Sequence, residues 1–159
     1  STQAKTLFPY TTLFRSGSSF PITAEPGPII IEKSPKPSYV GVPTIFKLQL
    51  ACQTLYRAFD EMPYLVGSSL ERPDWRDIDI VIIFPDDDFR AMFPNAGSLD
   101  HPQFEFDPKW MLMSIMISDW LSHQCGKPVE FKFQPRTWAN TTHKGRRNAM
   151  GIFFGKEEN

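Results

Sequence analysis

The chain has 159 residues, enough for one domain with its own core and too few for two of the usual size. Apolar residues make up 41% of the sequence and charged residues 22%, near the averages of globular proteins, which argues against a disordered or fibrous chain. The net charge of -1 offers no overall attraction to nucleic acids or membranes, so binding of a polyanion would need a local basic patch.

The first residues do not resemble part of a natural protein. TLFPYTTLFRS, Thr6 to Ser16, resembles the translation, in one reading frame, of a common short-read sequencing adapter. We therefore expect residues 1–16 to be an artefact, although a hydrophobic strand with a positive end is the alternative. Residues 17–43 are rich in Pro, Gly and Ser and predict an extended lead-in with one edge strand at Ile29 to Ile31. A single domain is expected over residues 44–159.

Four elements are expected before residue 95. Apolar residues at three- and four-residue spacing predict a helix from Thr44 to Glu61. A short apolar run at Tyr64 to Val66 predicts a buried strand, and the β-branched run Asp77 to Phe84 predicts a second one. A short helix over Asp86 to Met92, capped by Asp86, follows.

The sequence pattern of the second half of the chain predicts a long helix followed by an amphipathic strand. It does not predict a membrane span. The apolar set from Trp110 to Leu121 is expected to pack in the core, and Ser114 and Asp119 interrupt it. Cys52 and Cys125 are expected as buried, reduced thiols, so a cytoplasmic location is predicted. The expected elements are a loop over Asn95 to Asp107, a helix from Pro108 to Gln124 capped by Asp107 and ended by Gly126, a strand at Pro128 to Gln134, and a strand at Gly151 to Phe154.

Two acids mark the start of the strongest strand. Alternation places Asp77 and Asp79 on one face with Val81 and Ile83, so two carboxylates lie together on a strand that is otherwise apolar. Neighbouring anions repel and are costly to bury unless a cation lies between them, and magnesium prefers oxygen ligands. This favours a divalent metal site; the alternative is a pair of solvated charges at a frayed strand end.

A Gly-Ser turn precedes these acids. Gly67, Ser68 and Ser69 follow directly on the short strand, and the free N–H groups of such a turn can hold phosphate oxygens. The order along the chain is a hydrophobic strand, Gly-Ser, about nine residues, and then Asp-x-Asp on a second hydrophobic strand. This order resembles that of the DNA polymerase beta superfamily of nucleotidyltransferases. The resemblance is most specific over Tyr64 to Phe84. It implies an α+β nucleotidyltransferase fold, with a mixed sheet backed by helices, and two magnesium ions.

The resemblance also assigns roles to residues. Asp77 and Asp79 match the metal ligands, and Gly67 and Ser68, or Ser69 in place of Ser68, match the turn that contacts the triphosphate. Glu130 is the best match for the third carboxylate, which would bind metal and deprotonate the attacking hydroxyl. The alternative for Glu130 is the solvent-exposed face of an amphipathic strand, which it would share with Lys132 and Gln134.

Several arginines are candidates for binding the nucleotide. Arg72 and Arg76 lie in a segment that is shorter than in many relatives, and they either grip the triphosphate or balance nearby acids. The run from Arg136 to Arg147 mixes cations with Trp138 and His143, a composition able to hold phosphates and stack a base. A basic surface loop is the alternative, and Arg136 and Arg147 are the residues selected for nucleotide binding.

The expected activity is transfer of a nucleoside monophosphate from a nucleoside triphosphate to an acceptor hydroxyl on RNA, a protein or a small molecule. One alternative is an inactive nucleotide- or RNA-binding module of the same fold. A component of a toxin and antitoxin pair is another, since small relatives have that role. The sequence predicts neither the acceptor nor the oligomeric state.

Overall fold

The computed structural model describes residues 38–151, and the elements below belong to that part of the chain. The predictions for residues 1–16 and for Ile29 to Ile31 lie outside it. The helices are α2 (Thr44–Phe59), α3 (Ser68–Glu71), α4 (Asp86–Met92), the 3-10 helix η2 (Phe104–Phe106), α5 (Pro108–Cys125) and α6 (Arg136–Thr142). The strands are β1 (Pro63–Val66), β2 (Ile78–Phe84), β3 (Val129–Pro135) and β4 (Asn148–Ala149).

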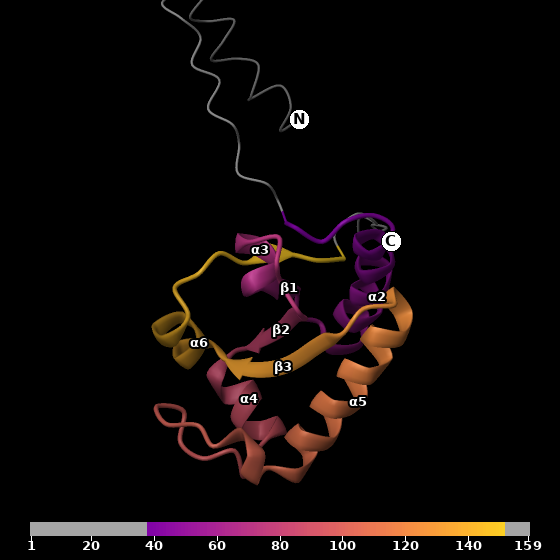
Figure 1. Cartoon of the computed structure of the whole chain (residues 1–159). Helices are drawn as coiled ribbons and strands as arrows, with labels where there is room; N and C mark the ends of the chain where they lie inside the picture. The colour runs from indigo at the N-terminus through magenta and orange to yellow at the C-terminus, as the bar shows by residue number, and fades with distance from the viewer. Residues whose placement is uncertain (1–37, 152–159) are drawn as a thin grey trace, which may run out of the picture. The chain divides into compact units, whose positions relative to one another are not determined.

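These strands form one mixed sheet in the order β3-β2-β1-β4. β1 is antiparallel to both β2 and β4, whereas β2 and β3 are parallel. A parallel pair needs a long crossover, and α4, η2 and α5 supply it between β2 and β3. Figure 1 shows α2 and α5 side by side, and α6 directly after the arrowhead of β3. The expected α+β class with a mixed sheet and helices is confirmed.

The two faces of β2 divide the apolar residues as predicted. Ile78, Ile80 and Ile82 are fully buried and join the main core beneath α2 and α5. On the opposite face Val81 and Ile83 pack against α6 in a smaller cluster. Burial of each such side chain contributes about 1.5–3 kcal/mol, so the register of β2 is strongly fixed. Asp79 is therefore held on the face that α6 only partly covers.

Local signals fix the long helices. Asp107 caps α5, since its Oδ1 accepts from the N–H groups of Lys109 (2.9 Å) and Trp110 (3.0 Å), and Gly126 ends the helix in the left-handed conformation. α2 begins at Thr44 as predicted but ends at Phe59, because Asp60 adopts a positive φ of 55°. In residues 38–151 no helix has both the length and the apolar character needed to cross a bilayer. Cys52 and Cys125 are free and buried, as expected.

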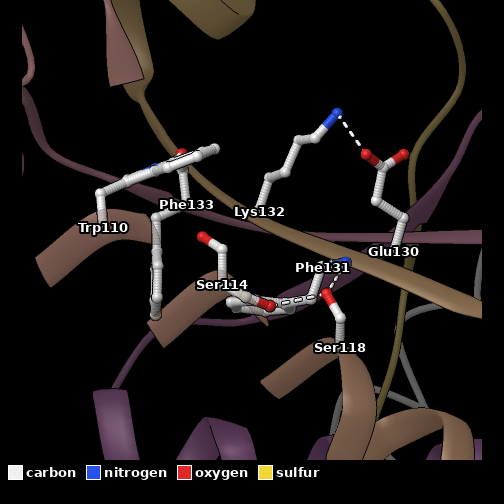
Figure 2. A network of polar contacts seen from close by, with 7 residues as sticks. All are labelled: Trp110, Ser114, Ser118, Glu130, Phe131, Lys132 and Phe133. Carbon is white, nitrogen blue, oxygen red and sulfur yellow. Dashed lines mark hydrogen bonds and ion pairs between the residues drawn. The ribbon is translucent and has the colours of Figure 1, made fainter. Parts of the chain in front are cut away.

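Side chains of α5 cover the open edge of β3 (Figure 2). Ser122 Oγ accepts from the Val129 N–H and Ser118 Oγ from the Phe131 N–H, both at 2.9 Å. Trp110 Nε1 donates to the Phe133 carbonyl oxygen at 3.0 Å. An uncovered edge would present unpaired backbone groups, so this series of side chains ends the sheet at β3.

The expectation that α5 is apolar core throughout was wrong for part of the helix. Ile115 and Met116 are more than half exposed, together with Leu112. The cause is the serine series, because α5 turns Ser114, Ser118 and their neighbours toward β3 and thereby turns Ile115 and Met116 toward solvent.

Other elements also differ from expectation. α3 stands where a turn was predicted, and α6 and β4 lie in the basic segment after Pro135, for which no helix or strand was predicted before Gly151. The strand predicted at Gly151 to Phe154 extends beyond the described residues, and Gly151 itself is not in a strand. β4 precedes it and pairs with Tyr64 and Leu65 of β1.

Asp86 does not cap its own helix. Pro85 is the residue before α4, and the Asp86 carboxylate instead accepts from the backbone N–H (2.9 Å) and the hydroxyl (2.5 Å) of Thr137, at the start of α6. These hydrogen bonds hold the pKa of Asp86 below its ordinary value. Asp86 thus caps a different helix, the one that bears Trp138.

We expect Asp86→Ala to lower the free energy of unfolding by about 1 kcal/mol, the usual value of a helix cap. The pKa of Asp86 is lower in the folded chain than in the unfolded chain. The cap therefore contributes its full stability at pH values above the unfolded-state pKa, and this contribution is lost as the pH falls through the folded-state pKa. Urea unfolding at several pH values measures it. Asp88→Ala, an exposed position on the same helix, is the control. An equal loss in both variants, or a loss independent of pH, would contradict the cap.

Candidate functional site

Three strands bring two of the predicted acids, Asp79 and Glu130, to the glycine of the Gly-Ser turn, whereas Asp77 precedes β2 and does not line the cavity. The parallel register aligns Asp79 of β2 with Glu130 of β3. The antiparallel register aligns Asp79 with Val66, the last residue of β1, so Gly67 follows immediately beside it. Asp79 and Glu130 project from the same face of the sheet, since paired residues share a face. The pairing of strands distant in sequence therefore assembles the site around Asp79.

Gly67 lies against the Asp79 carboxylate. Its backbone has φ 79° and ψ -156°, a region that essentially only glycine occupies. A Cβ placed on Gly67 would overlap Asp79 Oδ2, and the Asp79 Cγ would be 3.2 Å away. Glycine at this position both allows the sharp turn and leaves room for the carboxylate.

The acids differ in their electrostatic surroundings. Burial, and then the negative charges of Asp77 and Glu130, raises the pKa of Asp79 from 3.8 to about 6. A hydrogen bond from Lys132 holds the pKa of Glu130 below its ordinary value, and Lys132 Nζ lies 2.8 Å from Glu130 Oε1. Figure 2 shows the Glu130 and Lys132 side chains on the side of β3 away from Phe131. Near neutral pH, Asp79 carries a charge that its surroundings destabilise, whereas Lys132 stabilises that of Glu130.

The three predicted metal ligands, Asp77, Asp79 and Glu130, do not form a complete cation site by themselves. Among residues 38–151 no three acidic, thiol or imidazole side chains lie close enough to enclose an ion by themselves. Asp77 is exposed before β2 begins, and Lys132 holds Glu130. Magnesium is usually held by one or two carboxylates together with substrate phosphates and water. Asp79 lies near two other acids, and its pKa is raised. Its carboxylate is therefore of the kind that could bind magnesium together with substrate phosphates.

A cavity of about 630 Å³ opens beside these residues. Gly67, Asp79, Glu130 and Lys132 form part of its wall. α6 and the segment after it supply another part, which includes Trp138, His143, Lys144, Arg146 and Arg147. This volume falls within the range of sites for small molecules and cofactors. Acids and cations therefore share one pocket large enough for a nucleotide.

The residues predicted to bind the nucleotide are only partly brought together. Gly67 and Arg147 line the cavity, and Ser68 begins α3 next to Gly67 without lining it. Ser69 is fully buried, and its hydroxyl has no hydrogen-bond partner among the described residues. It points into the protein and so replaces Ser68 poorly. Arg72, Arg76 and Arg136 are exposed and lie outside the cavity wall; Arg72 pairs with Asp74 at 3.5 Å.

Arg147 and Arg146 have different partners. Arg147 closes the end of α6, donating to Asn140 Oδ1 (2.8 Å) and to the carbonyl oxygens of Ala139 (3.0 Å) and His143 (3.3 Å). Arg146 Nη2 donates to the Leu70 carbonyl oxygen in α3 (2.8 Å), and its buried Nε has no partner in the described part of the chain. Arg146, which sequence reasoning did not select, thus lines the cavity beside the turn at Gly67.

Lys132 and Gln134 were also missed as site residues. The sequence placed both on the polar face of the strand, with simple exposure to solvent as the alternative, yet both line the cavity, and Gln134 is buried. Their period-two spacing from Glu130 was the available signal, because it places all three residues on one face. No spacing rule separates Arg146 from Arg147 in the same basic run.

Comparisons of the chain with protein-family models, with curated proteins and with solved structures give no match. Function is therefore inferred from the chemistry of this cavity and from the sequence pattern around it.

Proposed function

We propose that the chain is a metal-dependent nucleotidyltransferase, which transfers a nucleoside monophosphate from a nucleoside triphosphate to an acceptor hydroxyl. The observation that carries the proposal is the meeting of Gly67, Asp79 and Glu130 at one cavity, although they come from three separate segments. The sequence pattern predicts a role for each of these residues without reference to their proximity in the fold. A surface with scattered acids would not place a glycine against the central carboxylate.

In the proposed reaction the acceptor oxygen forms a bond to the α-phosphorus, and the bond from that phosphorus to the bridging oxygen of the β-phosphate breaks. Pyrophosphate leaves with the electron pair. Glu130, kept ionised by Lys132, takes the proton of the acceptor hydroxyl and passes it to solvent. Magnesium, when bound, would supply positive charge to the transferring phosphoryl group.

Cationic side chains account for the binding of the triphosphate. The Leu70 carbonyl oxygen accepts from Arg146 Nη2 and so orients the guanidinium in the cavity wall that also contains Gly67. A guanidinium held there can donate to phosphate oxygens and adds a fixed positive charge. Lys144 lines the same cavity and is exposed, so it adds positive charge at the rim. Arg147 positions this segment through its bonds to α6.

We expect Arg146→Lys to raise the KM for the nucleoside triphosphate by about tenfold with a smaller change in kcat, because an ammonium group cannot reproduce a planar, anchored guanidinium. Steady-state pyrophosphate release measures both constants. Arg136→Lys, an exposed position outside the cavity wall, should leave them unchanged. Equal effects of the two substitutions would show that Arg146 has no specific role.

The activity itself is tested with nucleoside triphosphates labelled at the α-phosphate. The full chain is incubated with magnesium and with RNA, protein or polyol acceptors. We expect pyrophosphate release that EDTA abolishes, with label appearing on one acceptor class. Binding of nucleotide without pyrophosphate release under all these conditions would contradict the enzyme and favour the inactive binding module. The observation that favours this second candidate is the Lys132–Glu130 ion pair, because Lys132 occupies a carboxylate that a metal would otherwise share.

A further inference from the structure

Gln134 has no role in the chemistry described above, yet its position is unusual for a glutamine. It lies on β3, four residues beyond Glu130 and on the same face, which is about 13 Å along a strand. Its exposed fraction is 8%, and it lines the cavity. Its amide has no hydrogen bond to any side chain or backbone group of the described residues. The amide atoms are not among the buried polar atoms that lack a partner, so they reach the cavity and are available to a ligand there.

Aromatic rings surround the same part of the cavity. Phe104 stacks on Trp110 with ring centres 5.0 Å apart, and meets Trp138 edge-on at 5.1 Å. Trp138 also meets His143 edge-on at 5.1 Å. All four rings line the cavity. Aromatic walls bind bases of any kind by stacking, and the larger purines gain most from it.

Polar groups beside these rings favour one purine. An amide offers an acceptor and a donor side by side, which match the N6 amino group and the N7 nitrogen of adenine. Guanine presents two acceptors, O6 and N7, at that edge, and these match an arginine or a lysine better. Glu105 also lines the cavity, and a carboxylate accepts from an amino group but repels a carbonyl oxygen.

We propose that Gln134 and the aromatic wall form the base site of the cavity and select adenine nucleotides. The inference rests on the proposed function in one respect, namely that the nucleotide's phosphates lie at Asp79 and Arg146. The distance along β3 from Glu130 to Gln134 then suits the span from the phosphates to the base. Gln134 acts as a specificity residue and takes no part in bond formation.

The test is calorimetric binding to the full chain, with magnesium and the α,β-methylene analogues of ATP, GTP, CTP and UTP. Inorganic tripolyphosphate is titrated separately. We expect the adenine analogue to bind about tenfold more tightly than each of the others, the value of one bidentate pair. Gln134→Met should remove this preference and leave tripolyphosphate binding unchanged. Gln124→Met, an exposed site on α5 outside the cavity wall, should preserve it.

Each outcome bears on one proposal or on both. Equal binding of the four analogues, preference for another base, or adenine preference that survives Gln134→Met would overturn the base site and leave the proposed activity standing. Adenine preference of the analogues, combined with no pyrophosphate release from the α-labelled triphosphates in the activity assay, would support the base site and contradict the activity. Absence of binding by every analogue and by tripolyphosphate would overturn both. If Gln134→Met does not fold, the preference of the wild-type chain among the four analogues decides: a preference for adenine supports the base site, and equal binding overturns it.

Discussion

Asp79→Asn is expected to abolish nucleotide transfer while leaving a chain that is more stable than the wild type in the absence of metal. Asparagine keeps the shape of the side chain and removes the charge on which magnesium binding depends. A metal contributes several kcal/mol to stabilising the transition state, so pyrophosphate release should fall by roughly a thousandfold. Magnesium binding, measured by calorimetry with tripolyphosphate present, should weaken in parallel.

The gain in stability follows from the raised pKa of Asp79. The folded chain holds a proton on this group up to about pH 6, whereas the carboxyl of the unfolded chain loses it near 3.8. Between these two pH values the folded state binds more protons than the unfolded state. The contribution of Asp79 to stability is therefore full below pH 3.8 and is lost as the pH rises through about 6. Asp79 is half-buried and partly screened, which limits the cost at pH 7 to about 1 kcal/mol.

Urea unfolding in EDTA measures this cost. Asp79→Asn should be the more stable chain at pH 7, and the difference should disappear below about pH 4. Asp87→Asn is the matched control, because its side chain is 98% exposed and should affect neither stability nor activity. Retained transfer in Asp79→Asn would refute the proposed metal ligand. Lower stability at pH 7 would refute the idea that a destabilised carboxylate lies at the centre of the site.

The features that the sequence predicted depend on neighbouring residues. Asp107, Pro108 and Gly126 carry the signals for both ends of α5 within the helix and its caps, so both ends were predicted almost correctly. The alternation of Ile80 and Val81 likewise assigned the two faces of β2. Such signals do not depend on the rest of the chain.

The features that were missed depend on partners far along the chain. α6 is one short, largely polar helix, and its cap is Asp86, on the other side of the α5 crossover. β4 has two residues and exists because β1 offers an edge for pairing. The same holds for the site, since Arg146 and Arg147 are distinguished by their partners, Leu70 of α3 for Arg146 and the end of α6 for Arg147. The periodicity of a sequence cannot reveal such long-range contacts. A family motif can, because it implies that Asp79 and Glu130 lie close together.

Gly67→Ala is expected to be the most disruptive single-methyl change in the site. At φ 79° and ψ -156° a side chain costs about 1–3 kcal/mol in backbone strain alone. The new Cβ would also overlap Asp79 Oδ2, so the carboxylate must move from the position where it would meet the metal. We expect the free energy of unfolding to fall by about 2–4 kcal/mol and pyrophosphate release by roughly a hundredfold or more.

Two further variants separate backbone strain from displacement of the carboxylate. Gly126→Ala shares a positive φ of 76°, but its Cβ has no neighbour within 4 Å, so it should lose about 1 kcal/mol of stability and no activity. In Gly67→Ala combined with Asp79→Ala the overlapping carboxylate is absent. The stability of the double variant should then be higher than the sum of the two single changes predicts, whatever the sign of the Asp79→Ala change, and urea unfolding resolves this coupling. Additive losses would mean that Gly67 is needed for its backbone conformation alone, and that its contact with Asp79 does not position the carboxylate.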